Sequence, residues 1–340
     1  MASGDNMDNI AKIKQSIEHI VDPSFGKSLK ETDGIKHIAI DDEKNAVTLV
    51  IGVKKVDDQT KQQLTRSLAK IIKIDLGYRG MKIDFQRVID EESLLNKGRD
   101  IKYIGVASGK GGVGKSTVAA NLALALTRLG KRVGIIDADV YGSSIPTIFD
   151  MEIVLPKANA DEKIIPFTHE GIEIISTEFF LKDNKPLMWR GPMLGKMLNH
   201  FFEDIAWHQE LEYMIVDLPP GTGDVAMDIQ KLIPQSKMLI ITTPHPSASH
   251  VAIKAGYAAK ELNHGLLGVV ENMSYFRHNG DTIQIFGEGG GAEVAKRLET
   301  DLIAQIPIGQ PESGHHSLFG MEEPIGVDYL GLANKLIKSL

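Results

Sequence analysis

The chain has 340 residues, of which 42% are hydrophobic and 24% charged, with a formal net charge of −7. That length fits one or two ordinary globular domains. The negative net charge disfavours broad electrostatic attachment to nucleic acid. No apolar run approaches the ~18 residues of a membrane span, and residues 1–9 are unlike a secretory signal, so we expect a cytoplasmic protein. The chain has no cysteine, which excludes disulfides and thiolate-bound metal within it.

Residues 1–90 are predicted to fold as a small α/β unit with the element order α-β-β-α-β. Isoleucines recur at helical spacing over Ile10–Ile20, and Leu64–Ile72 marks a second helix in the same way. The three expected strands are apolar segments at 37–40, 46–53 and 81–85.

Residues 91–100 are mostly charged and polar, and we interpret them as a linker to a second domain at 101–340. In that domain short apolar strands alternate with helices, for example at 115–128 and 247–262. The strand candidates are 103–107, 132–137, 172–176, 213–217, 238–242, 266–271 and 302–306. This alternation predicts an α/β fold with a doubly wound, mostly parallel sheet that binds ligands at the carboxyl ends of its strands.

A phosphate-binding motif follows the first of these strands. The eight positions of the pattern G-x-x-x-x-G-K-[ST] are Gly109, Lys110, Gly111, Gly112, Val113, Gly114, Lys115 and Ser116, and Thr117 and a helix follow. Such glycines let the backbone N–H groups point at phosphate oxygens. Lys115 would bridge the β and γ phosphates, and the hydroxyl of Ser116 would bind Mg²⁺. The motif therefore predicts Mg²⁺-dependent ATP binding and hydrolysis.

Three aspartates follow strands that neighbour the motif. Asp137 ends the strand at 132–137 and Asp139 follows it by two residues, and Asp217 ends the strand at 213–217. We assign Asp217 to holding Mg²⁺, Asp137 to a second, outer contact with the metal, and Asp139 to orienting the attacking water. The alternative for an isolated aspartate after a strand is a turn-forming cap.

Seven sequence blocks together resemble the Mrp/ApbC group of iron–sulfur cluster carrier ATPases, within the MinD-like class of P-loop proteins. In order, the blocks are KGGVGKST, DADVYGSSIP, MWRGPM, VDLPPGTGD, ITTPHPSA, VENMSYF and FGEGGG. The resemblance covers residues 100–340. Residues 1–90, with Asp22–Pro23, also look like the small iron–sulfur assembly-type domain that is fused to bacterial members.

The resemblance assigns roles to further residues. It implies that Lys110 reaches across a homodimer to the partner's nucleotide, as an arginine finger would, where the alternative is a solvated loop lysine. It implies that Asn272 hydrogen-bonds adenine, the alternative being a strand-end cap, and that the segment from Pro307 closes over the base. It also implies that Trp189–Pro192 lies near the dimer interface or a switch region, although Trp189 could be plain core.

The same resemblance implies an iron–sulfur cluster held by a C-x-x-C pair after VENMSYF, yet residues 277–285 contain no cysteine. The N-terminal domain's usual cysteine, expected within 54–59, is also missing. His278 is a poor cluster ligand by itself, and the pair His315–His316 reads as a solvated loop.

Two main functions follow. One is an ATP-dependent carrier that transfers clusters to apoproteins with ligands from a partner or a small thiol. The alternative is an ATP-driven switch that regulates a partner protein or gene expression without a cluster. A metabolic kinase is a third reading, for which the sequence offers no acceptor pocket.

Overall fold

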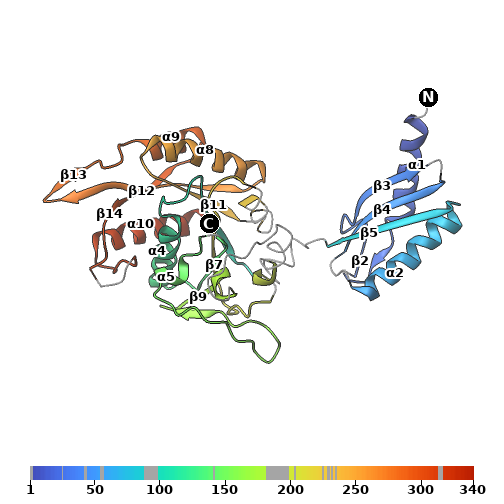
Figure 1. Ribbon diagram of the computed structural model, residues 1–340, viewed down its shortest axis with the longest axis horizontal. Helices are drawn as coiled ribbons and strands as arrows, with labels where there is room; N and C mark the ends of the chain where they lie inside the picture. The colour runs from blue at the N-terminus through green and yellow to red at the C-terminus, as the bar shows by residue number, and fades with distance from the viewer. Residues whose placement is uncertain are drawn as a thin grey trace. The chain divides into compact units, whose positions relative to one another are not determined.

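The computed structural model shows a chain of two compact units, Met1–Ser93 and Leu94–Leu340 (Figure 1). The described residues are 3–24, 26–41, 44–53, 57–87, 99–140, 142–180, 199–202, 204–223, 226–227, 230, 233, 236–312 and 317–340. Residues 91–98 of the expected linker, Trp189–Pro192 and His315–His316 therefore lie outside the described part of the chain.

The first unit has the predicted order α-β-β-α-β, with a short strand pair added after its first helix. Its elements are α1 (Ser3–Ile17), β1 (Val21–Asp22), β2 (Lys27–Ser28), β3 (Ile35–Asp41), β4 (Ala46–Val53), α2 (Asp58–Ala69), the π-helix η1 (Lys70–Asp75) and β5 (Gly80–Arg87). Strand β4 lies in the centre of the sheet, antiparallel to β3 and parallel to β5. Helix α2 begins after Asp57, whose side chain accepts a hydrogen bond from the N–H of Thr60.

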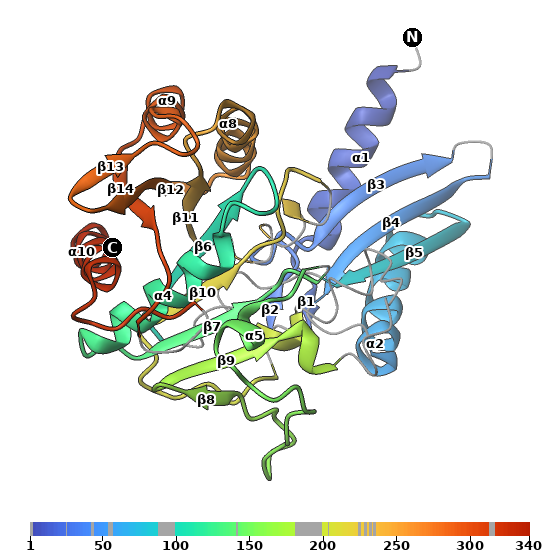
Figure 2. The ribbon, with the colours of Figure 1, turned by 60° about the vertical axis from the view of Figure 1, so that its left-hand side comes forward.

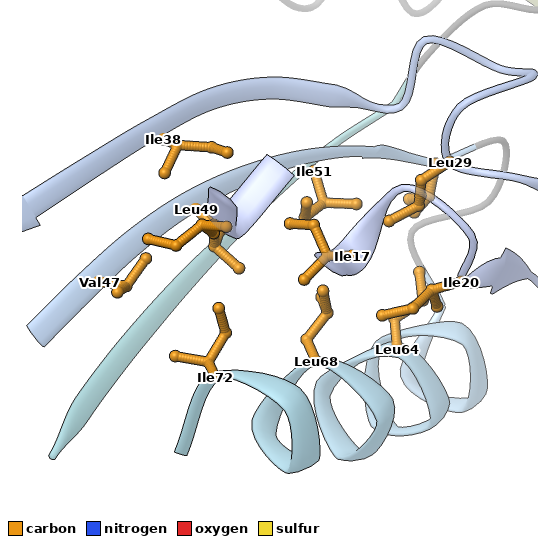
Figure 3. Packing of buried hydrophobic residues seen from close by; sticks show 12 residues of the cluster. Ile17, Ile20, Leu29, Ile38, Val47, Leu49, Ile51, Leu64, Leu68 and Ile72 are labelled. Atoms are coloured by element: carbon orange, nitrogen blue, oxygen red, sulfur yellow. The ribbon is translucent and has the colours of Figure 1, made fainter. Parts of the chain in front are cut away.

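The core of this unit is formed by aliphatic side chains of the helices packed against the sheet (Figure 3). Ile17, Leu49 and Leu68 are completely buried there. The second helix was predicted to run to Ile72 as one α-helix. Instead the last turns after Ala69 form η1, which still keeps Ile72 buried.

The second unit is built on a nine-stranded sheet, as counted in the described residues. Its strands are β6 (Lys102–Ser108), β7 (Val133–Asp137), β8 (Phe167–His169), β9 (Ile172–Ser176), β10 (Tyr213–Asp217), β11 (Lys237–Thr242), β12 (Gly265–His278), β13 (Asp281–Ile283) and β14 (Leu302–Ile308). The order is β13-β12-β11-β6-β10-β7-β9-β8, and β14 also pairs with β12. Among the strands that the structure describes in this sheet, only β8–β9 and β12–β13 are antiparallel pairs, which confirms the predicted doubly wound, mostly parallel α/β fold.

Helices cover both faces of this sheet (Figure 2). Helices α4 (Lys115–Arg128) and α10 (Pro324–Ser339) lie on one face, and α8 (Pro246–Glu261) and α9 (Gly290–Arg297) lie on the other. A short helix, α5 (Ile145–Ile148), follows β7. Among the described helices, none is both long and apolar enough to cross a membrane.

Strand β12 is longer than the predicted 266–271 and forms a hairpin with β13. Arg277 pairs with Thr282 and His278 with Asp281, so Asn279 and Gly280 make the two-residue turn. Their φ angles of 48° and 87° are left-handed, as the Asn-Gly turns of tight hairpins require. The segment in which the resemblance expects a cysteine pair is therefore a regular β-hairpin.

Candidate functional site

The strand order places the predicted site residues at one edge of the sheet. Strand β10 lies between β6 and β7, and Asp217 pairs in register with Asp137. The loop after β6 and the aspartates that end β7 and β10 therefore meet at the carboxyl ends of adjacent parallel strands, where open α/β sheets bind ligands.

Each of three glycines in the loop 109–114 is required by the geometry around it. Gly112 and Gly114 have left-handed φ angles of 81° and 78°, which cost other residues about 1–2 kcal/mol. A Cβ on Gly109 would collide with the backbone of Val251 in α8. These residues let the chain turn sharply from β6 into α4 while it stays packed on α8.

Lys115, Ser116 and Asp217 form one contact group at the start of α4. The Lys115 ammonium pairs with Oδ1 of Asp217 and lies 3.3 Å from Oγ of Ser116. Ser116 Oγ donates to the other carboxylate oxygen of Asp217 at 2.5 Å. Asp217 is fully buried. This hydroxyl and carboxylate are the oxygen donors that Mg²⁺ prefers, so the residues fit the predicted metal.

Asp139 adds a second carboxylate beside the same lysine. Its Oδ2 is 3.7 Å from the Lys115 ammonium, and burial raises the pKa of its carboxyl, opposed by the charge of Lys115. Asp139 also lines a cavity of about 770 Å³ together with Lys110, Gly112, Ser144 and Pro219. A carboxylate at the cavity wall, next to the lysine of the P-loop motif, is suited to orient a water molecule.

Asp137 lies deeper and is held on all sides. Its oxygens accept hydrogen bonds from the N–H groups of Asp139, Ser144 and Ile145 and from Oγ of Ser176, at 3.1–3.2 Å. Burial, and next the charge of Asp217, raise its pKa to about 7. These contacts fix the loop that carries Asp139, a role that the sequence did not indicate. The outer contact with Mg²⁺ stays a prediction.

Lys110 lies on the outer side of the loop. It lines the large cavity and also a smaller one of about 250 Å³, with His245 and Phe286. The ammonium of Lys110 forms no ion pair with any residue that the structure describes. Its side chain is thus uncommitted within the described chain, as the cross-dimer prediction requires.

Asn272 lies beneath the loop. Its Nδ2 donates to the carbonyl of Val113 at 2.9 Å, and a Cβ on Gly114 would overlap that nitrogen. The side chain is 6% exposed. The predicted hydrogen bond to adenine stays a prediction, and the observed contact shows that Asn272 also supports the loop.

The neighbouring Glu271 is a buried residue that sequence reasoning missed. Its carboxylate accepts hydrogen bonds from Gly291 N at 2.5 Å, Ser274 Oγ at 2.6 Å and Gln305 Nε2 at 2.8 Å. It therefore joins β12 to β14 and to the start of α9. The sequence signal for this role was a single carboxylate among the apolar residues of a strand.

Among the described residues, no three histidine, aspartate or glutamate side chains are arranged to hold a metal ion. His278 lies in the hairpin, where its ring stacks on Phe276 with centroids 6.0 Å apart. With no cysteine in the chain, this donor set does not fit an iron–sulfur cluster.

The strand–loop–helix phosphate cradle, with its lysine beside the carboxylate of an adjacent strand, places the chain among the P-loop NTPases. Residues 101–317 match the family model described as ParA: NUBPL iron-transfer P-loop NTPase. The chain belongs to this family, and its resemblance to Mrp/ApbC-type carriers is confirmed.

Known relatives agree with this assignment. The chain is 37% identical over 343 residues to the iron–sulfur cluster carrier protein of Bacillus subtilis, covering 96% of each. A nucleotide-binding protein from Archaeoglobus fulgidus, solved with ADP, is 32% identical, with a TM-score of 0.53, covering 69% of this chain and 87% of that one. The cell division ATPase MinD of Pyrococcus furiosus shares the fold, at 21% identity and a TM-score of 0.54 over 70% of this chain and 99% of that one.

Proposed function

We propose that this protein binds and hydrolyses ATP with Mg²⁺ and acts as a homodimer. The contact of Lys115 and Ser116 with buried Asp217 carries the proposal. It brings a phosphate-binding cation and two metal ligands together at the mouth of a cavity of about 770 Å³. The solved relative from Archaeoglobus fulgidus holds ADP, which supports a nucleotide in this cavity.

Each side chain has a defined task in hydrolysis. Lys115 leaves the carboxylates of Asp217 and Asp139 to bind the phosphates, and Asp139 orients the water that attacks the γ-phosphorus. Ser116 and Asp217 would hold Mg²⁺, which neutralises phosphate charge when bound. Lys110 from the partner copy stabilises charge on the transferred group.

ATP turnover and ATP binding of three variants test this proposal. Lys115→Ala is expected to abolish turnover, and Asp139→Ala to remove turnover while binding remains. Lys131→Ala is the matched control, since this lysine pairs with Glu212 at the surface, and it should behave as wild type. Normal turnover in Lys115→Ala would disprove the assignment of the site.

We further propose that the protein takes part in iron–sulfur cluster delivery with thiolate ligands supplied by the acceptor protein or a small thiol. Membership in the carrier family supports the cargo, and the absence of cysteine supports ligands from outside the chain. Anaerobic incubation with iron and sulfide should leave the protein alone colourless. With glutathione or an apo-acceptor present, a chromophore should form and activate the acceptor. A failure of transfer under both conditions would rule out this cargo.

The alternative is an ATP-driven switch that controls a partner without any cluster. The β12–β13 hairpin favours it, since a regular turn occupies the segment where the family resemblance expects ligands. Affinity capture with wild type and Lys115→Ala, each with and without ATP, distinguishes the two. A partner that binds only wild type with ATP, while cluster transfer fails, would establish the switch.

A further inference from the structure

Two adjacent buried hydroxyls lie at the carboxyl end of strand β9. Ser176 and Thr177 are both 0% exposed, and Ser176 pairs in register with Asp137 at the end of the neighbouring strand β7. The two hydroxyls therefore lie beside the residues that carry Asp139. A hydroxyl removed from water costs free energy unless it forms hydrogen bonds inside the protein. Ser176 donates to the carboxylate of Asp137, and Thr177 has a different partner.

The hydroxyl of Thr177 is joined to Asp139 through Ser143. Oγ1 of Thr177 lies 2.9 Å from Oγ of Ser143, and Oγ of Ser143 lies 3.0 Å from the carbonyl oxygen of Asp139. A serine hydroxyl has one hydrogen and a carbonyl oxygen can only accept, so Ser143 donates to Asp139. Thr177 is then the donor to Ser143. Because hydrogen bonds in a chain polarise one another, the bond from Thr177 strengthens the bond that Ser143 makes to Asp139.

Hydrogen bonds hold the main chain of Asp139 on both sides of its Cα. Its N–H donates to Oδ1 of Asp137 at 3.2 Å, and its carbonyl accepts from the N–H of Gly142 at 3.2 Å and from Ser143. With both peptide groups fixed, the direction in which the side chain leaves the main chain is fixed as well. In the structure the carboxylate lies 3.7 Å from the Lys115 ammonium. In the proposed reaction Lys115 moves to the phosphates, and the direction of the carboxylate then depends on these main-chain bonds.

We propose that Thr177 and Ser143 are positioning residues for Asp139, the residue that orients the attacking water in the proposed function. The inference rests on the proposed ATP hydrolysis and deepens it. Neither Thr177 nor Ser143 lines the cavity of about 770 Å³, so both act through Asp139 and not on the nucleotide. An error in the direction of a catalytic group lowers the rate of the chemical step. The two hydroxyls therefore contribute to kcat and not to ATP affinity.

The kcat for ATP hydrolysis and the Kd for ATP, both measured with Mg²⁺, separate these contributions. Ser143→Ala should lower kcat by about fivefold, which is the rate equivalent of one hydrogen bond. Thr177→Val keeps the shape of the side chain and removes only the donor, so it should lower kcat by about threefold. In both variants the Kd should stay within about twofold of wild type, since neither residue binds ATP. Thr177→Ser keeps a hydroxyl and should have the kcat of wild type.

The matched control is Thr127→Val, which removes a hydroxyl that donates at 3.0 Å to the carbonyl of Ala123 in its own helix. It should keep the kcat of wild type, even where it lowers the melting temperature as much as Thr177→Val does. Wild-type kcat in Ser143→Ala and Thr177→Val, or a kcat of Thr177→Ser as low as that of Thr177→Val, would overturn the proposal. Normal turnover in Asp139→Ala would instead disprove the proposed role of Asp139, so the two failures are distinguishable.

Discussion

At the scale of single residues, the phosphate loop offers two glycines with nearly the same backbone and different surroundings. Gly112 and Gly114 both have left-handed φ angles, but a Cβ on Gly112 would meet open space, while one on Gly114 would overlap the amide of Asn272. We expect Gly112→Ala to lower the free energy of unfolding by about 1–2 kcal/mol. Gly114→Ala should cost more, since it also breaks the bond from Asn272 to Val113.

Urea denaturation without nucleotide measures this difference, and a double-mutant cycle isolates its cause. On an Asn272→Ala background the collision is gone, so Gly114→Ala should cost no more than Gly112→Ala does. An excess cost that persists on that background would show that the contact with Asn272 is not the reason.

Residues whose neighbours are close in sequence could be predicted, and residues whose partners are distant could not. The loop 109–117 and the aspartates after β7 and β10 show their chemistry in short motifs. Asn121, which is buried in α4, belongs to no short motif. Its Oδ1 accepts a hydrogen bond from the N–H of Phe319, which is 198 positions away. Its one signal was a polar residue within an apolar helix, which indicates burial without naming the partner.

At the scale of elements, the β12–β13 hairpin has a sequence signal that was not used to predict it. Asn279–Gly280 between alternating apolar residues is a strong hairpin signal, and the pairing of Phe276 with Ile283 follows from it. The extension of β12 past the predicted 266–271, where it pairs with β14 and β13, was not predicted, although Asn279–Gly280 indicates the turn.

A second element-scale feature lies at the amino ends of β11 and β12. His264 is 4% exposed, and its Nδ1 lies 3.0 Å from Oγ of Ser236. Burial lowers the pKa of His264 below its ordinary value of 6.5. The unfolded chain then binds a proton more readily than the folded one, so this residue lowers the stability as pH falls through 6.5 and has no such effect above it.

Thermal denaturation at pH 7.5 and 5.5 checks this direction. Wild type should lose stability between the two values, and His264→Gln should lose less, because it cannot bind the proton. The exposed His245→Gln is the control and should keep the wild-type dependence. An identical pH response in wild type and His264→Gln would mean that other groups cause the loss.

At the scale of the whole molecule, Lys110 bears on assembly. Its ammonium, unpaired among the described side chains, is expected to contact the nucleotide of a second copy. Asp139→Ala loaded with ATP should therefore show twice the 37.2 kDa of one chain by light scattering. Adding Lys110→Ala should return it to one chain, while adding Lys131→Ala should not. A dimer that survives Lys110→Ala would remove the cross-dimer role.

The division into two units leads to a prediction about folding. The aliphatic core of the first unit, from Ile13 to Ile72, is formed entirely by residues of that unit. The second unit forms internal hydrogen bonds from near its first residues, since Arg99 donates to the carbonyls of Trp207 and His208. Each unit thus has the interior it needs to fold without the other. We expect two transitions in calorimetry of the full chain.

ATP identifies which transition belongs to which unit, because the proposed site lies wholly within the second. Ligand at about a hundred times its Kd stabilises the unit that binds it by about 2.7 kcal/mol. Only one transition should therefore move to higher temperature with Mg²⁺ and ATP, and neither should move in Lys115→Ala. Residues 99–340 alone should keep the ATP-sensitive transition and its turnover within about twofold. If ATP raised both transitions together, the units would be thermodynamically coupled, and the first unit would have a part in nucleotide binding.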